Sequence, residues 1–417
     1  MKIAHLIAQF YPYLGGAEIC VHNVCESLSK SGHGATVICT TPPSDKKPDV
    51  NYEIIHIHPK TCGLLRKAPF IGKFYLEYEL SRLQRKHKFD LWQVTMGYPL
   101  GIYAVDFFRK NKIPCVLRCC GEDIQKYPEI GYGYRLDKKA DSLVKEKYPL
   151  FDGFVALTPS VMEEYLALGI PEDKIRIIPN GVNTAKFAEI RMRSDKTAVR
   201  RKYGLSENKL LILTVGRYHP KKGFDEIPEI AEVLTDKNIT FDWAVAGKNC
   251  GQIAAKFPDC LKNGVKTVES LAKSGGEVFS LPSAELIELY CAADIFVLPT
   301  LIETFGMVLV EAMAAGLPIV TTDAPGVRDV ISDGVNGLKS PVGDPNAIAG
   351  LIAQIIRDKA LSCKLSENSI RHSREFYDWE IVCEQYLDLY QDVVAPRREN
   401  WTLAGQMREN KVKPCAG

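Results

Sequence analysis

Strands and helices alternate along most of this chain, and the alternating pattern occurs twice. Short apolar runs typical of buried strands are separated by longer stretches with helical periodicity. The first series of strands is expected at 2–10, 35–39, 53–58, 91–95, 114–119, 154–157 and 174–178, and the second at 210–215, 241–246, 277–281, 294–298, 317–321 and 337–339. Strands that alternate with helices form parallel sheets with helices on both faces. The sequence therefore predicts an α/β protein with two doubly wound, Rossmann-like domains.

The polar segment 186–206 has no strand signal and suits a linker between the two series. We therefore expect domains at 1–185 and 200–377, followed by a strongly helical segment at 378–394. The tail 396–417 is polar and is expected to be disordered. Ligands of doubly wound sheets bind beyond the carboxyl ends of the strands, so two such domains would face each other across a ligand-binding cleft.

The composition is that of a globular protein and argues against some classes of function. The net charge of +2 over 417 residues creates no general field that would attract nucleic acid. Residues 1–8 resemble a signal peptide only briefly, and we interpret them as the first strand. No apolar run reaches the roughly 18 residues that cross a bilayer.

The 13 cysteines are scattered and lie mostly within apolar runs, as expected for reduced thiols of a cytoplasmic protein. The chain has no C-x-x-C pair of the kind that binds structural zinc. It also has no D-x-D triplet that would hold a metal ion against a diphosphate. We therefore expect no metal site.

The stretch 294–323 indicates a strand, a turn, a buried helix and a second strand. Thr304 is expected to cap a helix over 305–315, in which every residue is apolar or glycine except Glu311. Glu303 lies in the turn just before this helix. A carboxylate in a buried helix needs hydrogen-bond donors, because an unpaired buried charge costs several kcal/mol.

The N-terminus of that helix lies between the two glutamates and offers free N–H groups to an anion. Such an arrangement suits a ligand with hydroxyl groups at both ends and a phosphate in the middle, as in a nucleotide sugar. The alternative, of equal weight from this stretch alone, is a structural glutamate satisfied by backbone groups or by a nearby lysine.

Two loops beyond strand ends carry further candidates. Gly15 and Gly16 separate the first strand from the first helix, where the backbone could approach a ligand, although a plain turn explains them equally well. Arg217 and Lys222 follow the first strand of the second domain. A guanidinium and an ammonium group together suit a diphosphate, and a solvated basic loop is the alternative.

Arg118 and Asp123 follow a strand of the first domain. Both lie at the edge of the sheet where ligands of doubly wound domains bind. They could contact sugar hydroxyls or pair with each other, and the sequence leaves these two interpretations open.

The stretch 60–88 is basic and carries eight Lys or Arg residues against Glu77 and Glu79, with apolar residues interleaved. A basic stretch of this kind can lie on an anionic membrane. A helix with one core face and one solvated face is the more common structure for such a pattern.

Together these motifs resemble the family-4 glycosyltransferases of the GT-B fold over nearly the whole chain. The most specific element is the Glu-x7-Glu stretch from Glu303 to Glu311, which contains Thr304, Phe305 and Gly306. Four shorter motifs accompany it in the expected order: Gly15-Gly16, Pro179-Asn180-Gly181-Val182-Asn183, Gly216-Arg217 with Lys222-Gly223, and Asp333-Gly-Val-Asn-Gly337.

The resemblance implies specific roles for these residues. Glu303 would contact the donor sugar, Glu311 the ribose, and Arg217 and Lys222 the diphosphate; of these, Glu303, Arg217 and Lys222 would be catalytic. The donor would also be surrounded by Gly15, Gly16, Thr304, Phe305 and Gly306, and the sugar or acceptor pocket would include Arg118, Asp123 and Asn180. Many members have a histidine where this chain has Cys120, and this difference leaves the donor sugar open.

The implied activity is that of a retaining, metal-independent hexosyltransferase that needs no cofactor beyond its nucleoside-diphosphate sugar. It would transfer the sugar to an acceptor hydroxyl in glycan, glycolipid or cell-surface polysaccharide synthesis, with the acceptor on the first domain and the C-terminal helix crossing back onto that domain. The alternatives are a glycoside hydrolase, a nucleotide-sugar epimerase and an inactive subunit of a transferase complex. If the acceptor is lipid-linked, we expect residues 60–88 to hold the protein at the inner face of the plasma membrane.

Overall fold

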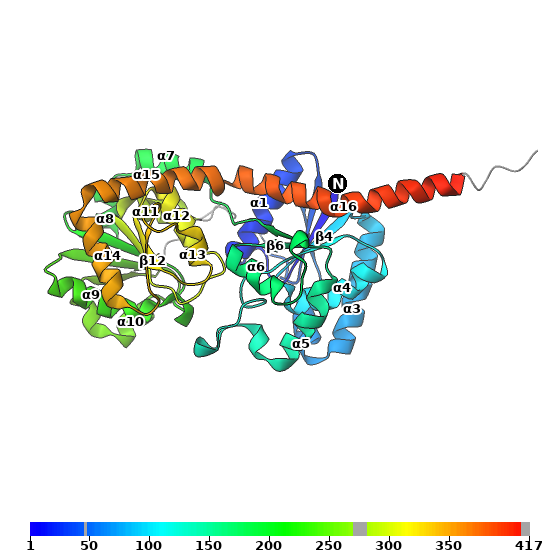
Figure 1. Cartoon of the computed structure of the whole chain (residues 1–417), viewed down its shortest axis with the longest axis horizontal. Coiled ribbons are helices and arrows are strands. Elements are labelled where there is room, and N and C mark those ends of the chain that lie inside the picture. Colours follow the sequence, from blue (N-terminus) through cyan, green and yellow to red (C-terminus); the bar gives the residue numbers. More distant parts are fainter. Residues whose placement is uncertain (46–47, 270–281, 410–417) are drawn as a thin grey trace, which may run out of the picture.

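The computed structural model describes residues 1–45, 48–269 and 282–409. It contains two parallel sheets of seven and six strands, each with helices on both faces, side by side in the molecule (Figure 1). This architecture confirms the predicted pair of Rossmann-like domains. Among the helices of the described residues, none combines the length and apolar character that a bilayer span requires.

The first sheet has the strand order β3-β2-β1-β4-β5-β6-β7, and all of its pairings are parallel. The order changes direction between β1 and β4, so this gap is the topological switch point of the domain. Its strands are β1 (Lys2–Ile7), β2 (Gly34–Cys39), β3 (Glu53–His56), β4 (Leu91–Thr95), β5 (Cys115–Arg118), β6 (Gly153–Ala156) and β7 (Ile175–Ile177). Its longer helices are α1 (Gly16–Lys30), α2 (Thr61–Lys67), α3 (Pro69–His87), α4 (Ile102–Lys110), α5 (Lys138–Lys147) and α6 (Pro159–Leu166).

The second sheet has the order β10-β9-β8-β11-β12-β13, and its switch point lies between β8 and β11. Its strands are β8 (Leu210–Val215), β9 (Phe241–Ala246), β10 (Val265–Val268), β11 (Ile295–Leu298), β12 (Ile319–Thr322) and β13 (Leu338–Ser340). The surrounding helices are α9 (Ile227–Asp236), α10 (Gly251–Lys256), α11 (Ala284–Ala292), α12 (Met307–Ala315), α13 (Val327–Val330), α14 (Pro345–Arg357) and α15 (Lys359–Phe376). The strand expected at 277–281 falls outside the described residues. Strand β10 was not predicted, because only the two ends of this four-residue edge strand are buried.

The segment 186–206, which we expected to be a linker, is helical instead. It contains most of α7 (Thr184–Arg193) and all of α8 (Lys196–Lys202). The side chains of Asn183 and Asp195 cap these two helices, and Phe187 is fully buried in the core of the second domain. The segment has no strand, as expected, but the polar composition hid these apolar contacts and caps, so its two helices were not predicted.

The last helix, α16 (Trp379–Glu409), leaves the second domain and runs back along the first (Figure 1). Val382, Tyr386 and Tyr390 are fully buried in the first-domain core, packed among residues of β1 and α1. The helix also continues beyond the expected end at 394, so residues 396–409 are helical rather than disordered as predicted. The helical hydrogen-bonding pattern carries on past Pro396 despite the polar composition, while 410–417 lie outside the described residues.

Candidate functional site

The switch point of the second sheet brings together two loops that the sequence analysis had singled out separately. Gly216 and Arg217 follow β8, and the turn that contains Glu303 follows β11. Two hydrogen bonds to the carbonyl oxygen of Lys221 join the loops, one from the Leu301 amide at 2.8 Å and one from the Thr300 hydroxyl at 2.7 Å. The loop after β8 is thereby fixed directly over the Glu303 turn.

Gly223 permits this close approach of the two loops. Its φ is +64°, and a Cβ atom at this position would lie only 1.7 Å from the carbonyl oxygen of Pro299. Any side chain would push the β8 loop away from the turn, so the glycine of the Lys222-Gly223 motif serves backbone packing.

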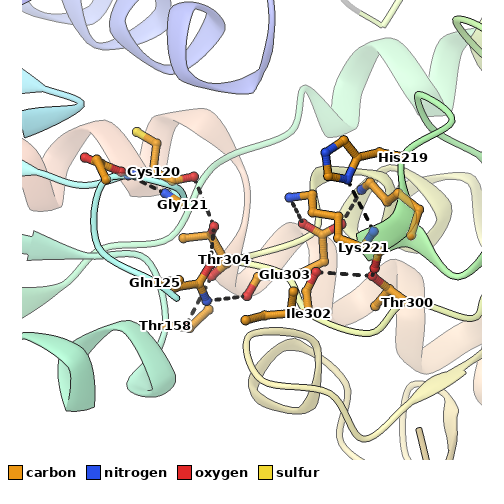
Figure 2. Close-up of polar contacts among 12 residues, drawn as sticks. Cys120, Gly121, Gln125, Thr158, His219, Lys221, Thr300, Ile302, Glu303 and Thr304 are labelled. Atoms are coloured by element: carbon orange, nitrogen blue, oxygen red, sulfur yellow. Dashed lines mark hydrogen bonds and ion pairs between the residues drawn. The ribbon is translucent and has the colours of Figure 1, made fainter. Parts of the chain in front are cut away.

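Glu303 lies between two lysines (Figure 2). Its Oε2 is 3.3 Å from Nζ of Lys221, and its Oε1 accepts a hydrogen bond from Nζ of Lys222. Burial alone would raise the pKa of the Glu303 carboxyl, but the two lysines outweigh this effect and hold the pKa at about 2. The site therefore contains a fixed carboxylate next to two ammonium groups in a largely enclosed place.

Lys221 was not among the predicted site residues, because adjacent lysines in a loop do not indicate which side chain points inward. Both do: Lys221 also lies over the ring of Tyr132, 5.0 Å from its centroid, and so connects the first domain to Glu303. Arg217 is exposed, and no ion pair among the described residues includes it. Its positive charge contributes to a lowered pKa of the Lys222 ammonium, for which burial is the main cause.

Glu311 is buried within α12, as the apolar pattern predicted, and its partner is a tyrosine. The hydroxyl of Tyr290 on α11 donates to Oε2 of Glu311 at 2.8 Å. Burial raises the pKa of the Glu311 carboxyl to about 7, although the Tyr290 bond and the charge of Lys222 oppose the rise. The N-terminus of α12 has no side-chain cap, and the Glu311 carboxyl lies on this same nine-residue helix.

Helix α12 begins at Met307 rather than at Phe305, with Gly306 at the N-cap in the left-handed region, φ +82°. Thr304 is therefore not the helix cap that we expected. Its hydroxyl lies 3.0 Å from the carbonyl oxygens of Cys120 and of the Gln125 side chain, both in the first domain. The prediction failed because the partner of Thr304 is far away in the sequence.

The Glu303–Thr304 backbone is a contact between the two domains (Figure 2). Nε2 of Gln125 donates to the Glu303 carbonyl at 2.8 Å, and the Thr158 hydroxyl donates to the Thr304 carbonyl at 3.2 Å. The Gly15-Gly16 loop also faces this region, because a Cβ on Gly16 would lie 3.2 Å from Cγ of Met307 at the start of α12. The structure thus brings the predicted donor residues of both domains together.

Arg118, Asp123 and Asn180 lie beneath this region, and all three are buried. Arg118 donates to Oδ1 of Asn180, at 2.5 Å, and to the hydroxyl of Tyr386 on α16. Asp123 accepts backbone N–H bonds from Gly97, Cys120 and Gly121 rather than pairing with Arg118. Their contact with a sugar or an acceptor stays a prediction; in this structure their polar atoms bind protein.

Cys120 occupies the position at which the resemblance implies a histidine. Burial raises the pKa of its thiol to about 12, although the charge of Arg118 opposes the rise. A neutral thiol cannot replace an imidazole in proton transfer near pH 7. Any role of Cys120 toward a ligand is therefore limited to shape and weak hydrogen bonding.

The first domain has a cavity of about 440 Å³ at its own switch point. Ala8 and Gln9 beyond β1, Thr40 beyond β2 and Met96 beyond β4 form its floor, and Arg66 of α2 forms part of its wall. The sequence analysis did not find this cavity, since its walls come from five separate segments.

Two family models match the chain. Glycosyltransferase Family 4 matches residues 14–186, and Glycosyl transferases group 1 matches residues 195–372. The chain belongs to the family-4 glycosyltransferases. It has their GT-B fold and is an enzyme of the hexosyltransferase type. This assignment favours the transferase interpretation over the hydrolase and the epimerase.

Similar curated glycosyltransferases act on several different substrates, as their names state. A D-inositol 3-phosphate glycosyltransferase of Acidothermus cellulolyticus is 31% identical over 58% of this chain, a match that spans only 53% of the relative. A GDP-mannose-dependent alpha-mannosyltransferase of Mycobacterium tuberculosis is 24% identical over 94% of this chain and 97% of the relative. The relatives therefore agree on the reaction class of this family-4 chain, glycosyl transfer, and differ in donor and acceptor.

Solved structures agree on the fold. Sucrose-phosphate synthase from Thermosynechococcus elongatus superposes with a TM-score of 0.75 at 20% identity, covering 95% of this chain and all of that one. Anabaena HepE in complex with UDP-glucose superposes with a TM-score of 0.69 at 18% identity, covering 93% and 99% of the two chains. At these identities the likeness shows the shared architecture alone.

Proposed function

We propose that this glycosyltransferase uses a nucleoside-diphosphate sugar as donor and binds it at the switch point of the second domain. The observation that carries the proposal is the cluster of Lys221, Lys222 and Glu303, with Arg217 beside it, at the N-terminal side of α12. Positive groups and free helix N–H groups suit a diphosphate. Glu303, with its carboxylate held ionised, suits a sugar hydroxyl, and Glu311 suits the ribose.

The chemistry that these residues support is departure of the nucleoside diphosphate from the sugar carbon. Arg217 and Lys222 would stabilise the negative charge that grows on the leaving phosphate, and Lys222 needs little reorganisation because Glu303 already holds it in place. The first domain, which contacts the Glu303–Thr304 turn, would orient the acceptor and exclude water. The imidazole of His219 adjoins this cluster: its Nδ1 accepts from the Lys221 amide at 3.3 Å, and burial lowers its pKa. We propose a retaining reaction in which the leaving phosphate, rather than this imidazole, takes the acceptor proton.

The acceptor would bind in the first-domain cavity. A volume of about 440 Å³ falls in the range of small-molecule sites, and ligands of doubly wound sheets bind at the switch point. The Gly15-Gly16 loop leads from this side of the sheet toward Met307 and so connects the cavity with the donor site.

The direct test is thermal unfolding of the protein with a panel of nucleoside diphosphates and nucleotide sugars. A ligand at 100 times its dissociation constant should stabilise the fold by about 2.7 kcal/mol. We expect one base and one sugar to be preferred, and the same ligand should be hydrolysed or transferred. If no nucleotide stabilises the protein, the donor site is assigned wrongly.

Activity should survive treatment with EDTA. The reason is that the sequence has no D-x-D triplet and that lysines and Arg217 surround the proposed diphosphate site. The measurement compares turnover before and after chelation, then with added Mg²⁺ or Mn²⁺. Loss of turnover that a divalent cation restores would contradict metal independence.

We further propose that helix α3 touches an anionic membrane on the cytoplasmic side. Its core face contains Gly72, Leu76, Leu80 and Leu83. A second apolar face is open to solvent: Phe70 is 87% exposed, Phe74 74%, Ile71 61% and Tyr78 56%. Exposed apolar patches with basic neighbours suit a lipid surface. The net positive charge is smaller than the sequence indicated, since Lys73 pairs with Asp106 at 2.7 Å.

Co-sedimentation with vesicles tests this contact. The wild type should bind vesicles rich in phosphatidylserine, and salt should weaken the binding because electrostatic attraction decays within roughly 10 Å at 0.1 M ionic strength. Replacing Phe70 and Phe74 by serine should lower the partition coefficient about tenfold or more, from the loss of buried apolar area. The control is Met192→Ser, since Met192 is 82% exposed on α7. Equal sedimentation of the double variant and the control would show that Phe70 and Phe74 do not bind the membrane, and that α3 is an ordinary surface helix.

A further inference from the structure

The cavity at the first switch point has a single charged side chain among its lining residues, the guanidinium of Arg66. This group lies beside two aromatic rings of the same cavity, 5.6 Å from the ring centroid of Tyr98 and 5.4 Å from that of Tyr134; the two rings contact each other, with centroids 5.2 Å apart. No ion pair among the described residues includes Arg66. An arginine that points into a cavity without a carboxylate partner is available to a ligand.

The two tyrosines position the guanidinium. Cation–π contacts of this kind are attractive, so the long side chain is partly preorganised. The Tyr134 hydroxyl takes part in a hydrogen bond with this guanidinium, and a guanidinium has five N–H donors, so others remain available to a ligand. Those donors match the geometry of a phosphate or carboxylate, which arginine binds with two parallel hydrogen bonds.

The rest of the cavity offers little competition for these donors. The Thr40 hydroxyl already donates to the Ala8 carbonyl at 2.7 Å, and the lining residues within the described chain include no aspartate or glutamate. Met96, at the end of β4, has φ +64°, a conformation that is uncommon for a residue with a long side chain. Such backbone strain is concentrated at ligand sites.

We infer that the acceptor bound in this cavity carries an anionic group, a phosphate or a carboxylate, which Arg66 recognises. The inference rests on the proposed function in that it takes the cavity to be the acceptor site. The anion would anchor the acceptor at Arg66, on the α2 side of the cavity. Its reacting hydroxyl would then point along the Gly15-Gly16 loop toward the donor.

The test compares a neutral and a phosphorylated form of one sugar, glucose and glucose 1-phosphate. The protein is first saturated with the nucleoside diphosphate found in the thermal screen, so that the phosphate sites of the second domain are filled. Binding is then measured by isothermal titration calorimetry. We expect glucose 1-phosphate to bind the wild type about tenfold or more tightly than glucose, the scale of one hydrogen bond to a charged group.

Arg66→Ala should remove this preference, and Arg66→Lys should restore part of it through the charge alone. The matched control is Arg85→Ala, because Arg85 is another exposed arginine of the same basic stretch but does not line the cavity. All three variants should bind the nucleoside diphosphate as the wild type does.

The possible results distinguish a failure of anion recognition by Arg66 from a failure of the proposed nucleotide-sugar function. If the nucleotide binds but neither glucose 1-phosphate nor a short-chain, water-soluble phosphatidylinositol is preferred over its neutral counterpart, the inference about Arg66 is overturned. An equal loss of the preference for glucose 1-phosphate in Arg66→Ala and Arg85→Ala would also overturn the inference. Such a result would indicate that the overall positive charge of the stretch, and not Arg66, attracts the phosphate. If only the phosphatidylinositol shows an Arg66-dependent preference, the inference holds and the anion belongs to a lipid. Failure of every nucleotide to bind the wild type would instead reject the proposed function.

Discussion

Lys222→Ala is expected to lower turnover by about a hundredfold or more, the scale for losing one preorganised charge at a developing anion. Lys222 is enclosed beside Glu303, and its ammonium group is held in place before any substrate arrives. The loss should appear in kcat measured with saturating nucleotide sugar, because the charge on the leaving phosphate develops in the transition state. Unchanged turnover would remove Lys222 from the catalytic site.

The same substitution should also destabilise the protein, because Glu303 would keep only Lys221 as a partner. Removing one partner of a buried ion pair costs up to about 3–5 kcal/mol, and Lys221 should reduce this cost. The matched control is Arg217→Ala: this exposed residue should show a similar loss of turnover with an unchanged melting temperature. A melting temperature that falls equally in both variants would contradict the different roles of the two side chains.

The pH dependence of stability gives a further signature of this cluster. The pKa of Glu303 is about 2 in the folded protein, below its ordinary value of 4.5. A lowered pKa contributes stability that is fully present above pH 4.5 and is lost as the pH falls toward 2. In Lys222→Ala the pKa of Glu303 should rise, so this contribution should be smaller and should be lost at a higher pH.

Glu311→Ala is expected to weaken nucleoside-diphosphate binding by about tenfold or more, the scale for hydrogen bonds from a ribose to a charged acceptor. Glu311→Gln should lose less, since the amide can still accept one hydrogen bond. The affinity of the wild type should rise as the pH increases through about 7, where the Glu311 carboxyl ionises. Isothermal titration calorimetry between pH 5.5 and 8.5 measures both effects.

Tyr290→Phe separates the ribose contact from general packing. It removes the hydroxyl that donates to Glu311 but keeps the buried ring. Without that donor the pKa of Glu311 should rise further, and the pH at which nucleotide affinity increases should shift upward. If Glu311→Ala binds the nucleotide as the wild type does, the ribose assignment is wrong.

In the ligand-free protein, the contribution of Glu311 to folding stability should fall as the pH rises, whereas the nucleotide affinity should increase. A folded pKa raised from 4.5 to about 7 contributes stability that is fully present below 4.5 and is lost as the pH rises through 7. The change over this window is about 3 kcal/mol at most. Glu311→Gln should remove this slope in chemical denaturation experiments, and a slope that persists would indicate another titrating group.

The fold and the candidate site residues of the second domain could be predicted from the sequence, because they depend on local sequence patterns. Alternating apolar runs and amphipathic helices determine parallel sheets, and glycines such as Gly223 mark the places where loops approach each other. The isolated Glu311 inside an apolar helix indicated a buried polar contact. Arg217 and Lys222 could be placed at a strand end, since that position depends only on the order of strand and loop.

What the sequence could not determine was the partner of each polar side chain. Thr304 reads as a helix cap, yet it contacts Cys120 and Gln125 of the other domain. For Arg118 the sequence left open a sugar contact or a pairing with Asp123, and in the structure it donates to Asn180 and Tyr386, the latter 268 positions away. Local patterns cannot reveal contacts that form only when distant segments pack.

The sequence by itself therefore determined two doubly wound domains, the reaction class through its family motifs, and the position of Arg217, Lys222 and Glu303 beyond the strand ends of the second sheet. Only the tertiary structure decided that Lys221 joins Lys222 at Glu303, that the segment 186–206 forms α7 and α8, and that Arg66 lies in a cavity beside two tyrosines. The physical reason is that strand and helix patterns depend on near neighbours in the chain. A cavity or a buried ion pair depends instead on which distant side chains exclude water together.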